Sequence, residues 1–396
     1  MARHVRSMTS RVVIVGASLG GVRTASALRR EGFTGEIIII GDEVHEPYDR
    51  PPLSKQILLG KWGTEKLALL NETTHAELNA EWKLGSAAVA LRSVDNGHVV
   101  ELADGSQVAG DIVVIATGTR ARRLPFSADS QLFAVRTLDD TTALLSAVES
   151  LAAGNRVAVI GAGFIGAEVA TALKARELVP VVYETQARPL NAVLGESAAR
   201  WLEQLPADAE VEVRANQSIS DVIATASGVT VVTTEGSEEY ALGVLGVGAL
   251  PNAEWLATSG LTIDRGVVVD GSLQATPGVY AVGDVASFPF ERAGRREVIR
   301  IEHWQIANDH ATYVAQHICG KSAADFSTVP YFWSDQYGKK IQMLGHPHPD
   351  DEIEMVLGSV DEGKWLAHYR HNGVITGVLA LNNARELMLS KPLLEE

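Results

Sequence analysis

Two glycine-rich turns with the spacing of phosphate-binding fingerprints lie about one domain length apart. The first is Gly16-Ala17-Ser18-Leu19-Gly20-Gly21, after the apolar run 12–15, and the second is Gly161-Ala162-Gly163-Phe164-Ile165-Gly166, after the apolar run 157–160. A buried strand, a tight turn and a helix start direct backbone N–H groups and the positive end of a helix dipole toward a pyrophosphate. Two copies therefore predict two dinucleotides. The simplest pair is FAD, which is held permanently, and NAD(P)H, which comes and goes.

Each fingerprint is followed by carboxylates at the position that binds the adenosine ribose of a dinucleotide. Asp42 and Glu43 follow the apolar run 36–40 and lie 26 and 27 residues after Gly16, and Glu184 lies 23 residues after Gly161. A carboxylate at this place accepts hydrogen bonds from the adenosine ribose and repels a 2′-phosphate. We therefore expect NADH rather than NADPH at the second site, with Arg188 close enough to soften the preference. The alternative for Glu184 is an exposed acid at a strand end.

The first fingerprint departs from the usual pattern at its middle position, where Ser18 replaces glycine. Serine is small enough to let the backbone approach a phosphate, so the departure weakens the match without removing it. A single fingerprint would be weak support, because glycine turns before helices are common. Here each copy has its strand, turn, helix and acid in order, and this full context favours two dinucleotide sites.

A proline-rich segment places two cations. In Pro47-Tyr48-Asp49-Arg50-Pro51-Pro52-Leu53-Ser54-Lys55, three prolines restrict the backbone ahead of a helix start and hold Arg50 and Lys55. Glu168 lies two residues after Gly166, in the first turn of the second fingerprint helix. We predict a Lys55–Glu168 ion pair at the flavin, where the lysine supplies charge and hydrogen bonding near N5. The alternative is two ordinary charges on helix surfaces.

Residues late in the chain complete the candidate redox site. Asp284 follows a strand-like run and is placed to hold the ribityl chain of a flavin. A helix beginning near His303-Trp304 would point its positive end at flavin N1 and O2, although His303 fits a structural role equally well. The run Tyr331-Phe332-Trp333-Ser334-Asp335-Gln336-Tyr337 is either a wall over the flavin, with only Trp333 facing it, or the core of the last domain.

The order of the expected elements divides the chain into domains. Strands 11–15 and 36–40 with the helix between them form one βαβ unit, and strands 157–160 and 180–184 form a second. We expect a buried strand within 111–118, a hairpin-like region at 210–240 and a helix from about 301 to 318. Strand-like runs at 340–344, 353–357, 364–369 and 374–380 predict a small α/β domain. The domains predicted are FAD-binding at 1–115 and 248–321, NAD(H)-binding at 116–247 and C-terminal at 322–396.

Composition argues against several classes of function. The 396 residues carry a net charge of −15, which argues against a general nucleic-acid binder. Cys319 is the only cysteine, so no intrachain disulfide or paired redox thiol forms, and we expect a buried structural thiol in a reducing cytoplasm. No apolar run is long enough to span a membrane, and the basic segment 1–8 lacks the apolar core of a secretory signal and predicts a disordered extension.

Two clusters of charge or metal-ligating residue types stand apart from the fingerprints. Basic residues gather at 292–300, as Arg292, Arg295, Arg296 and Arg300, and again at Lys339-Lys340. They are either a docking patch for an acidic partner or a solvated loop. His346-Pro347-His348-Pro349-Asp350-Asp351 contains metal-ligating types, but its alternating prolines favour an exposed turn, and we expect no metal site.

At its most specific motifs the chain resembles the flavin-dependent ferredoxin reductases that serve bacterial Rieske dioxygenases and cytochromes P450, from about Arg11 to the C-terminus. The motifs are Pro-Tyr-Asp-Arg-Pro-Pro-Leu-Ser-Lys at 47–55, Ala-Thr-Gly at 116–118, Gly-Phe-Ile-Gly-Ala-Glu at 163–168, Val-Gly-Asp at 282–284, Arg-Ile-Glu-His-Trp at 300–304 and Phe-Trp-Ser-Asp-Gln at 332–336. The departures are Ser18 and a short tail after Leu394, and neither removes a matched functional residue.

The resemblance implies a glutathione-reductase-like flavoprotein fold, with two Rossmann-like α/β domains and a C-terminal interface domain. It implies non-covalent FAD at the first fingerprint and NADH at the second. Beyond the fingerprints, the residues expected at FAD are Asp42, Glu43, Arg50, Lys55, Val89, Ala116, Thr117, Gly118, Arg136, Gly283, Asp284, His303 and Trp304. Those expected at NADH are Glu168, Glu184, Arg188 and Gly248, and Trp333 is expected beside the flavin. The candidate catalytic residues are Lys55, Glu168 and Trp333.

We expect a hydride to pass from NADH to FAD and single electrons to pass on to a ferredoxin of the [2Fe–2S] type that feeds a P450 or Rieske oxygenase. One alternative on the same fold is an NADH oxidase or a quinone or small-molecule reductase. An alternative of another class is a redox-sensing binding protein whose surface responds to NADH. The protein is expected to be a cytoplasmic monomer or homodimer without nucleic-acid or membrane partners.

Overall fold

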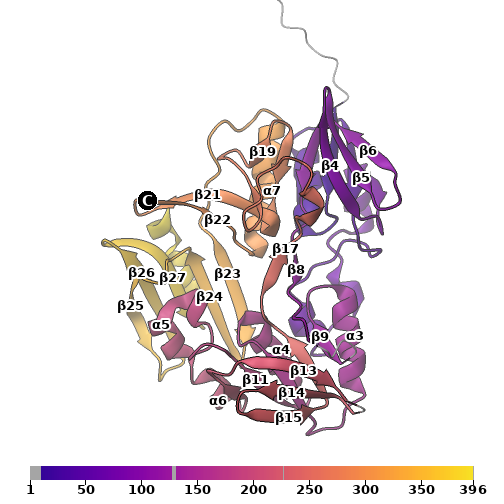
Figure 1. The fold of residues 1–396 in the computed structure, drawn as a ribbon. Coiled ribbons are helices and arrows are strands. Elements are labelled where there is room, and N and C mark those ends of the chain that lie inside the picture. The colour runs from indigo at the N-terminus through magenta and orange to yellow at the C-terminus, as the bar shows by residue number, and fades with distance from the viewer. Residues whose placement is uncertain (1–9, 127–130, 226, 396) are drawn as a thin grey trace, which may run out of the picture. The chain divides into compact units, whose positions relative to one another are not determined.

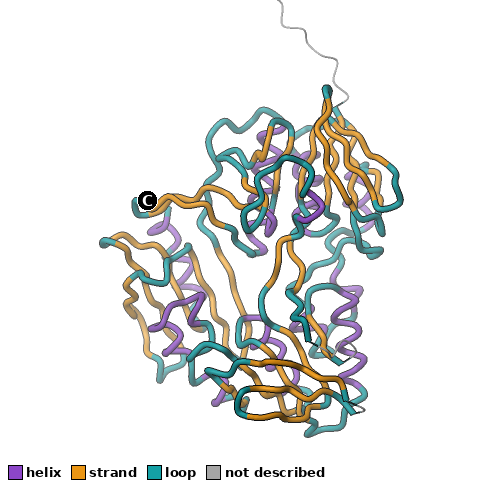
Figure 2. Tube along the Cα trace, viewed as in Figure 1, coloured by secondary structure: helices purple, strands orange, loops and turns teal. Residues whose placement is uncertain are grey.

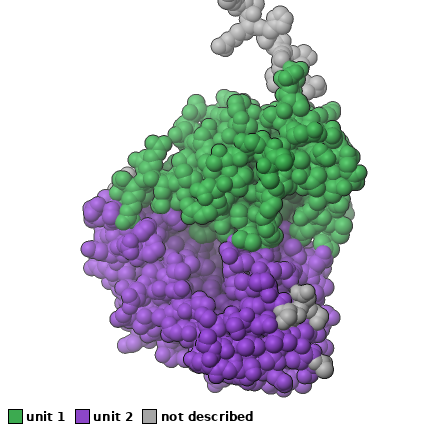
Figure 3. All heavy atoms as spheres, viewed as in Figure 1, with its two compact units in different colours: residues 1–49, 68–120, 250–328 green, residues 50–67, 121–249, 329–396 purple. Residues whose placement is uncertain are grey.

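The structure, a computed structural model, describes residues 10–126, 131–225 and 227–395. The extension predicted at 1–8 lies outside the described residues. The chain forms two compact units, which Figure 3 colours separately. The first unit contains residues 1–49, 68–120 and 250–328, and the second contains 50–67, 121–249 and 329–396. The predicted domain boundaries stay a prediction.

The first unit is built on a six-stranded sheet in the order β19-β20-β7-β1-β2-β3, of which Figure 1 labels β19. Its strands are β1 (Arg11–Val15), β2 (Glu36–Ile40), β3 (Glu81–Lys83), β7 (Ile112–Ile115), β19 (Gln274–Thr276) and β20 (Val279–Ala281). All neighbours pair in parallel except β19 with β20. Helix α1 (Leu19–Arg30) connects β1 to β2, and α7 (Trp304–Ile318) packs beside α1. The predicted βαβ unit at 11–40 is confirmed.

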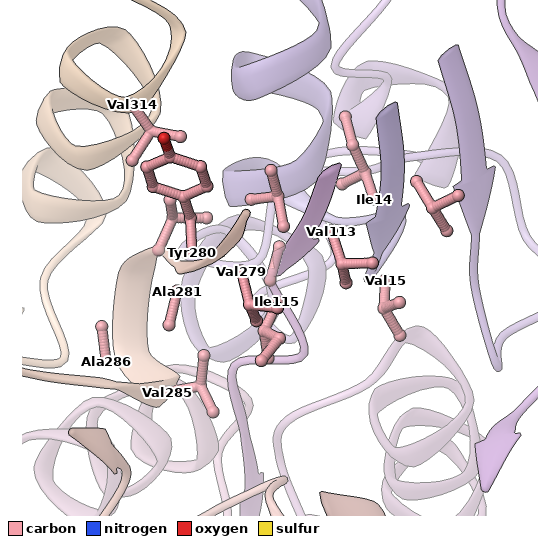
Figure 4. Close-up of a cluster of buried hydrophobic side chains, with 14 of the residues drawn as sticks. Ile14, Val15, Val113, Ile115, Val279, Tyr280, Ala281, Val285, Ala286 and Val314 are labelled. Carbon is pink, nitrogen blue, oxygen red and sulfur yellow. The ribbon is translucent and has the colours of Figure 1, made fainter. Parts of the chain in front are cut away.

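The core of this unit explains why its strands are continuous apolar runs. A parallel sheet has both faces covered, so side chains on both sides of each strand must be buried. Ile14, Val113 and Val279 lie on neighbouring strands, and none has any exposed surface. Figure 4 shows them with Tyr280 and with Val314 of α7. Predicted strand boundaries are therefore accurate here, because the apolar residues of each run end where burial ends.

Smaller elements complete the first unit. β4 (Ala88–Val94), β5 (Gly97–Leu102) and β6 (Gln107–Gly110) form an antiparallel sheet, and β21 (Ala286–Arg292) and β22 (Arg295–Ile299) form a hairpin beside β18 (Val267–Val268). The remaining pieces are α2 (Glu72–Leu78), η3 (Glu254–Leu256) and η4 (Gly283–Val285). Two short strands, β8 (Thr119–Ala121) and β17 (Ala249–Pro251), pair with each other where the chain passes between the units.

The second unit contains a five-stranded sheet, all parallel, in the order β12-β11-β10-β16-β9. Its strands are β9 (Leu132–Ala134), β10 (Arg156–Ile160), β11 (Val179–Tyr183), β12 (Glu212–Arg214) and β16 (Leu242–Leu245). The helices are α3 (Leu138–Glu149), α4 (Phe164–Ala175), α5 (Asn191–Leu202) and α6 (Leu205–Asp208). Two short helices precede them in the chain: η1 (Leu53–Ile57), which begins within the proline-rich segment, and η2 (Thr64–Leu67), which follows it. The second predicted βαβ unit is confirmed.

The region predicted as hairpin-like at 210–240 is more elaborate than predicted. β12 joins the parallel sheet, whereas β13 (Ile219–Ala224), β14 (Val229–Thr233) and β15 (Gly236–Tyr240) form a separate antiparallel sheet. A polar network joins the two sheets. Glu238 accepts hydrogen bonds from Arg214 and, at 2.9 Å, from Arg156, while the hydroxyls of Tyr183 and Tyr240 lie 2.7 Å apart.

This network gives stability a defined pH dependence. The hydrogen bond from Arg214 lowers the pKa of Glu238 from 4.5 to about 2. Because the folded-state pKa is the lower one, the contribution is present above about pH 4.5 and is lost as the pH falls toward 2. We expect Glu238→Gln to lower the free energy of unfolding at pH 7 by up to about 1 kcal/mol, since the pair is partly exposed. Urea unfolding at several pH values should show this difference shrinking below pH 4.5. A difference that stays constant down to pH 3 would contradict the assignment.

The C-terminal part of the second unit is mainly an antiparallel sheet in the order β23-β24-β27-β26-β25 (Figures 1 and 2). The strands are β23 (Tyr331–Gln336), β24 (Lys339–Gly345), β25 (Glu352–Ser359), β26 (Lys364–His371) and β27 (Val374–Leu381), followed by α8 (Ala384–Leu389) and η5 (Lys391–Leu394). One face packs on α5 and the other on α8 and η5. The four predicted strand-like runs are confirmed, and the aromatic run at 331–336 is a fifth strand that the sequence did not identify.

Candidate functional site

The first glycine turn lies in the first unit between β1 and α1, and packing fixes its outer two glycines. Gly16 has a φ of +121°, and a Cβ atom there would lie 2.2 Å from the Ala116 carbonyl oxygen. A Cβ atom on Gly21 would lie 1.8 Å from the Gly16 carbonyl oxygen. Ser18 is the N-cap of α1 in an extended conformation that any residue adopts, so serine fits the turn. The turn therefore leaves the first backbone N–H groups of α1 as a phosphate cradle.

Most of the other residues predicted to bind FAD follow parallel strands of the same sheet. Asp42 and Glu43 follow β2, Ala116-Thr117-Gly118 follow β7, and Gly283-Asp284 follow β20. Because the carboxyl ends of parallel strands meet at one edge, these segments share an edge with the glycine turn, where ligands of open α/β sheets bind. Tyr48 donates a hydrogen bond to Glu43, and the Thr119 hydroxyl lies 3.2 Å from Asp284. The residues present thus fit an FAD site.

A group that no sequence pattern indicated supports the loop of Gly283 and Asp284. His310 of α7 is fully buried, and its Nδ1 accepts a hydrogen bond of 3.2 Å from the Gly283 N–H. Burial lowers the pKa of His310 to about 3, so the ring is neutral and Nδ1 stays an acceptor. Arg300 donates to the Asp284 carbonyl oxygen at 3.1 Å. Arg300 thus belongs to this loop as well as to the predicted basic cluster.

Trp304 and Val89 lie in the first unit at defined places. α7 begins at Trp304 after His303 as an extended N-cap, which confirms the predicted start near His303-Trp304 and lies three residues after the broader predicted range that begins at about 301. The Trp304 indole N–H donates to the Asp49 carboxylate at 2.9 Å. This hydrogen bond ties the proline-rich segment to the start of α7. Val89 lies at an irregularity of β4 and is 44% exposed, so its side chain is open to a ligand.

The second glycine turn, between β10 and α4, repeats the geometry of the first in the second unit. Gly161 has a φ of +100°, and a Cβ atom on Gly166 would lie 1.9 Å from the Gly161 carbonyl oxygen. A Cβ atom on Gly163 would meet no protein atom closer than 3.9 Å. Protein packing therefore does not require the middle glycine, and the remaining reason for it is close approach of a phosphate. Ile165 is exposed on the same turn, while Phe164 packs against Phe332.

Glu184 is the first residue after β11, and backbone groups hold its carboxylate. Oε2 accepts from the Ala162 N–H at 3.0 Å, and Oε1 accepts from the Gln186 N–H at 2.8 Å. The carboxylate is therefore fixed beside the glycine turn rather than being a loose acid at a strand end. Gly248, after β16, has a φ of +90° and open space at its Cβ position. Arg188 is paired with Glu203, with 2.6 Å between Nε and Oε2.

A buried ion pair lies between the proline-rich segment and α4. The Lys55 Nζ is 2.7 Å from Glu168 Oε2, and the side chains are only 12% and 3% exposed. The Ser54 hydroxyl donates to the same oxygen at 2.6 Å, and the Ser334 hydroxyl donates to Oε1 at 2.6 Å. The proline-rich segment and β23 thus both supply partners to the Glu168 carboxylate of α4. This burial excludes the alternative that Lys55 and Glu168 are ordinary charges on helix surfaces. Glu168 is the first residue of the second turn of α4, whereas we predicted it in the first turn.

Trp333 does not join this cluster, because it lies on the other face of β23. Alternate residues of a strand point to opposite faces. Phe332, Ser334 and Gln336 are buried, whereas Tyr331 and Trp333 are half-buried and stack with their ring centroids 5.9 Å apart. The interpretation of this run as core is confirmed for the alternate residues Phe332, Ser334 and Gln336, whereas a place for Trp333 beside the flavin stays a prediction.

Arg50 and Arg136 lie in the second unit, as does Lys55. Arg50 donates to the Arg136 carbonyl oxygen at 2.8 Å, and Arg136 follows β9. The other residues predicted at FAD lie in the first unit.

Cys319 is half-buried rather than buried as predicted, and burial raises its pKa. Among the described residues, no group of three or more His, Cys, Asp or Glu side chains is arranged to hold a metal ion. Within the described ranges, no helix has the length and apolar character needed to cross a membrane.

Comparison with known proteins shows the family to which this chain belongs. Residues 10–311 match the pyridine nucleotide-disulphide oxidoreductase family, and residues 331–396 match the reductase C-terminal family. The chain therefore belongs to the pyridine nucleotide-disulphide oxidoreductases, as the paired glycine turns indicate. The predicted α/β fold with two Rossmann-like domains and a C-terminal domain is confirmed. This family implies the use of FAD and NAD(H).

Particular relatives cover nearly the whole chain. Rhodocoxin reductase of Rhodococcus erythropolis is 34% identical over 389 residues, 97% of this chain and 89% of that protein. The benzene 1,2-dioxygenase system ferredoxin–NAD(+) reductase subunit of Pseudomonas putida is 34% identical over 393 residues, 98% of this chain and 93% of its own. The reductase in the covalent putidaredoxin reductase–putidaredoxin complex matches with a TM-score of 0.90 and 31% identity, over 97% of this chain and 93% of that one.

Proposed function

We propose that this protein is an NADH-dependent ferredoxin reductase that supplies electrons to a cytochrome P450 or Rieske oxygenase in the cytoplasm. The observation that carries the proposal is the similarity to ferredoxin reductases along almost the whole chain, including the C-terminal domain. Disulfide reductases of the glutathione and thioredoxin type need a pair of redox cysteines, and this chain has only Cys319. The chain therefore offers no thiol pair that would carry electrons from a bound flavin to an acceptor.

The residues divide the work between two dinucleotide sites. The glycine turn at 16–21, with the Asp42–Glu43 pair and Asp284, would hold non-covalent FAD, and the turn at 161–166, with Glu184 and Gly248, would hold NADH. When bound, FAD accepts a two-electron hydride and releases electrons singly. Lys55 is held by Glu168 in a fixed position, so it can supply a positive charge without reorganisation. Trp333, on the accessible face of β23, is proposed to lie near the acceptor.

We propose that the partner is a ferredoxin with a [2Fe–2S] cluster that docks transiently on basic residues. Arg292 and Arg295 face each other at the tip of the β21–β22 hairpin. Lys340 pairs with Asp335 at 3.2 Å, and Arg300 supports the Asp284 loop. The hairpin tip is the candidate contact because it brings two arginines of neighbouring strands together.

Reversal of charge at the hairpin tip tests this contact. We expect Arg292→Glu with Arg295→Glu to raise the KM for ferredoxin about tenfold at low salt, because rim charges govern association. NADH–ferricyanide activity should not change. Arg265→Glu, an exposed arginine elsewhere in the first unit, is the control. Ferredoxin turnover that is indifferent to the reversal would place the docking surface elsewhere.

Anaerobic stopped-flow spectroscopy tests the proposed function as a whole. The yellow holoprotein is mixed with NADH while flavin absorbance is followed, and a [2Fe–2S] ferredoxin with cytochrome c is then added. We expect fast bleaching followed by ferredoxin-dependent reduction of cytochrome c. Fast bleaching with oxygen consumption but no transfer to ferredoxin would instead identify an oxidase or small-acceptor reductase. A long-lived reduced complex with very slow turnover would identify a redox-sensing protein.

A further inference from the structure

The loop after β11 carries a cation at the place where NADP-dependent proteins need one. Arg188 follows the ribose carboxylate Glu184 by four residues, between β11 and α5. An arginine near this strand end is the group that accommodates the 2′-phosphate of NADPH. Sequence alone therefore leaves the two residues in conflict, because Glu184 disfavours the 2′-phosphate that Arg188 would attract.

The structure resolves this conflict through α5. Arg188 Nε lies 2.6 Å from Glu203 Oε2, and its Nη1 lies 3.7 Å from Glu196 Oε1. Glu196 also pairs with Arg200 at 2.9 Å, so Glu203 is the main partner of Arg188. Glu184 is held separately by the backbone N–H groups of Ala162 and Gln186. The carboxylate stays at the glycine turn while the guanidinium is bound by the helix.

The helix that carries these acids is itself fixed. The Tyr369 hydroxyl of β26 donates to the Leu194 carbonyl oxygen at 2.7 Å, and Leu194, Ala198 and Leu202 pack on the C-terminal sheet. Gly195 breaks the helix with a φ of +77°, and a Cβ atom there would lie 3.1 Å from the Pro349 carbonyl oxygen. α5 therefore holds Glu196 within the helix and Glu203 directly after its last residue, both next to the part of the helix that packs on the C-terminal sheet.

We propose that Glu203, assisted by Glu196, is a specificity-determining residue that withholds Arg188 from the 2′-phosphate and so makes the second site selective for NADH. The inference rests on the proposed function, because it requires a nicotinamide dinucleotide at the second glycine turn. NADPH binding would need Arg188 to leave Glu203, and the phosphate would then face both Glu184 and the released acid. Selectivity is a difference in affinity, and this arrangement acts by opposing the wrong ligand.

The exposure of the Arg188 and Glu203 side chains determines how strongly their ion pair can affect the preference for NADH. The Arg188 and Glu203 side chains are 29% and 44% exposed, so their ion pair contributes modestly in water. Removing the acids should therefore improve 2′-phosphate binding about tenfold and not by several orders of magnitude. Glu184 remains in place and still favours NADH. We expect a relaxed preference rather than a reversed one.

The test measures binding and turnover of the holoprotein with matched ligand pairs. Calorimetry compares 2′,5′-ADP with 5′-ADP, and steady-state ferricyanide reduction compares NADPH with NADH. Glu203→Gln combined with Glu196→Gln should tighten 2′,5′-ADP and raise kcat/KM for NADPH about tenfold. Adding Arg188→Ala to this variant should abolish the gain. Glu210→Gln, which removes an exposed ion pair with Lys174 in the same unit, is the control.

The outcomes separate the inference from the function on which it rests. An unchanged preference in the double variant, or a gain that survives Arg188→Ala, would overturn the inference, because the guanidinium would then not be the group released. A wild-type holoprotein that binds neither NADH nor 5′-ADP would overturn the proposed function instead. If Glu210→Gln improved 2′,5′-ADP binding and NADPH turnover as much as the double variant does, the gain would come from the lower net negative charge of the protein. That result would also overturn the inference.

Discussion

Lys55→Met should slow the reduction of the flavin by NADH about a hundredfold, the size expected when a fixed charged donor is removed. It should also lower the free energy of unfolding by about 3 kcal/mol, because Glu168 would keep a buried negative charge with only two serine hydroxyls as partners. Stopped-flow absorbance measures the first effect and urea unfolding of the holoprotein the second. Lys61→Met, an exposed lysine of the same segment, is the control.

A second substitution separates the two effects of Lys55→Met. In Lys55→Met/Glu168→Gln no charge remains buried, so most of the lost stability should return. Flavin reduction should stay slow, because the cation is still missing. Reduction that recovers together with stability would mean that Lys55 acts only by supporting the fold. Ser334→Ala should weaken the cluster less, and Ser334→Thr, which keeps the hydroxyl, should be the milder of the two changes.

Gly166→Ala and Gly163→Ala should fail for different reasons although they lie in one turn. A Cβ atom on residue 166 would lie 1.9 Å from a backbone carbonyl oxygen, so the turn must move, and we expect a loss of roughly 3 kcal/mol or more. Residue 163 has an extended backbone and free space, so its alanine variant should unfold at the wild-type temperature. Its KM for NADH should nevertheless rise about tenfold, because the methyl group stands where a phosphate approaches.

Scanning calorimetry and NADH titration of both glycine variants distinguish packing from ligand contact. Gly154→Ala, at a position of the second unit with a φ of +82° and open space around its Cβ position, is the control for destabilisation away from the NADH turn. A normal KM in Gly163→Ala would remove this turn from the NADH site. A normal melting temperature in Gly166→Ala would mean that the turn relaxes more easily than its backbone contact indicates.

The sequence by itself determined the two parallel-sheet frameworks and their glycine turns. Strands 11–15 and 36–40 were predicted to the residue, because continuous apolar runs are required in a sheet covered on both faces. The turns were predictable because only glycine tolerates the conformations at Gly16 and Gly161, so the signal is local in the chain. The aromatic run at 331–336 was ambiguous, because a half-buried strand and a ligand wall require similar residues.

The Lys55–Glu168 pair was predicted, but tertiary structure alone decided which other polar groups meet it. Ser54 and Ser334 reach Glu168 across 114 and 166 residues of sequence, and no local pattern encodes these contacts. The same holds for His310, which supports Gly283 from α7, and for the face of β23 that carries Trp333. Arg188 is the clearest case: its position in the sequence suggested a phosphate ligand, and a carboxylate on a neighbouring helix determines what it binds. Local sequence specifies backbone conformation, whereas the partners of a charged side chain depend on how distant elements pack.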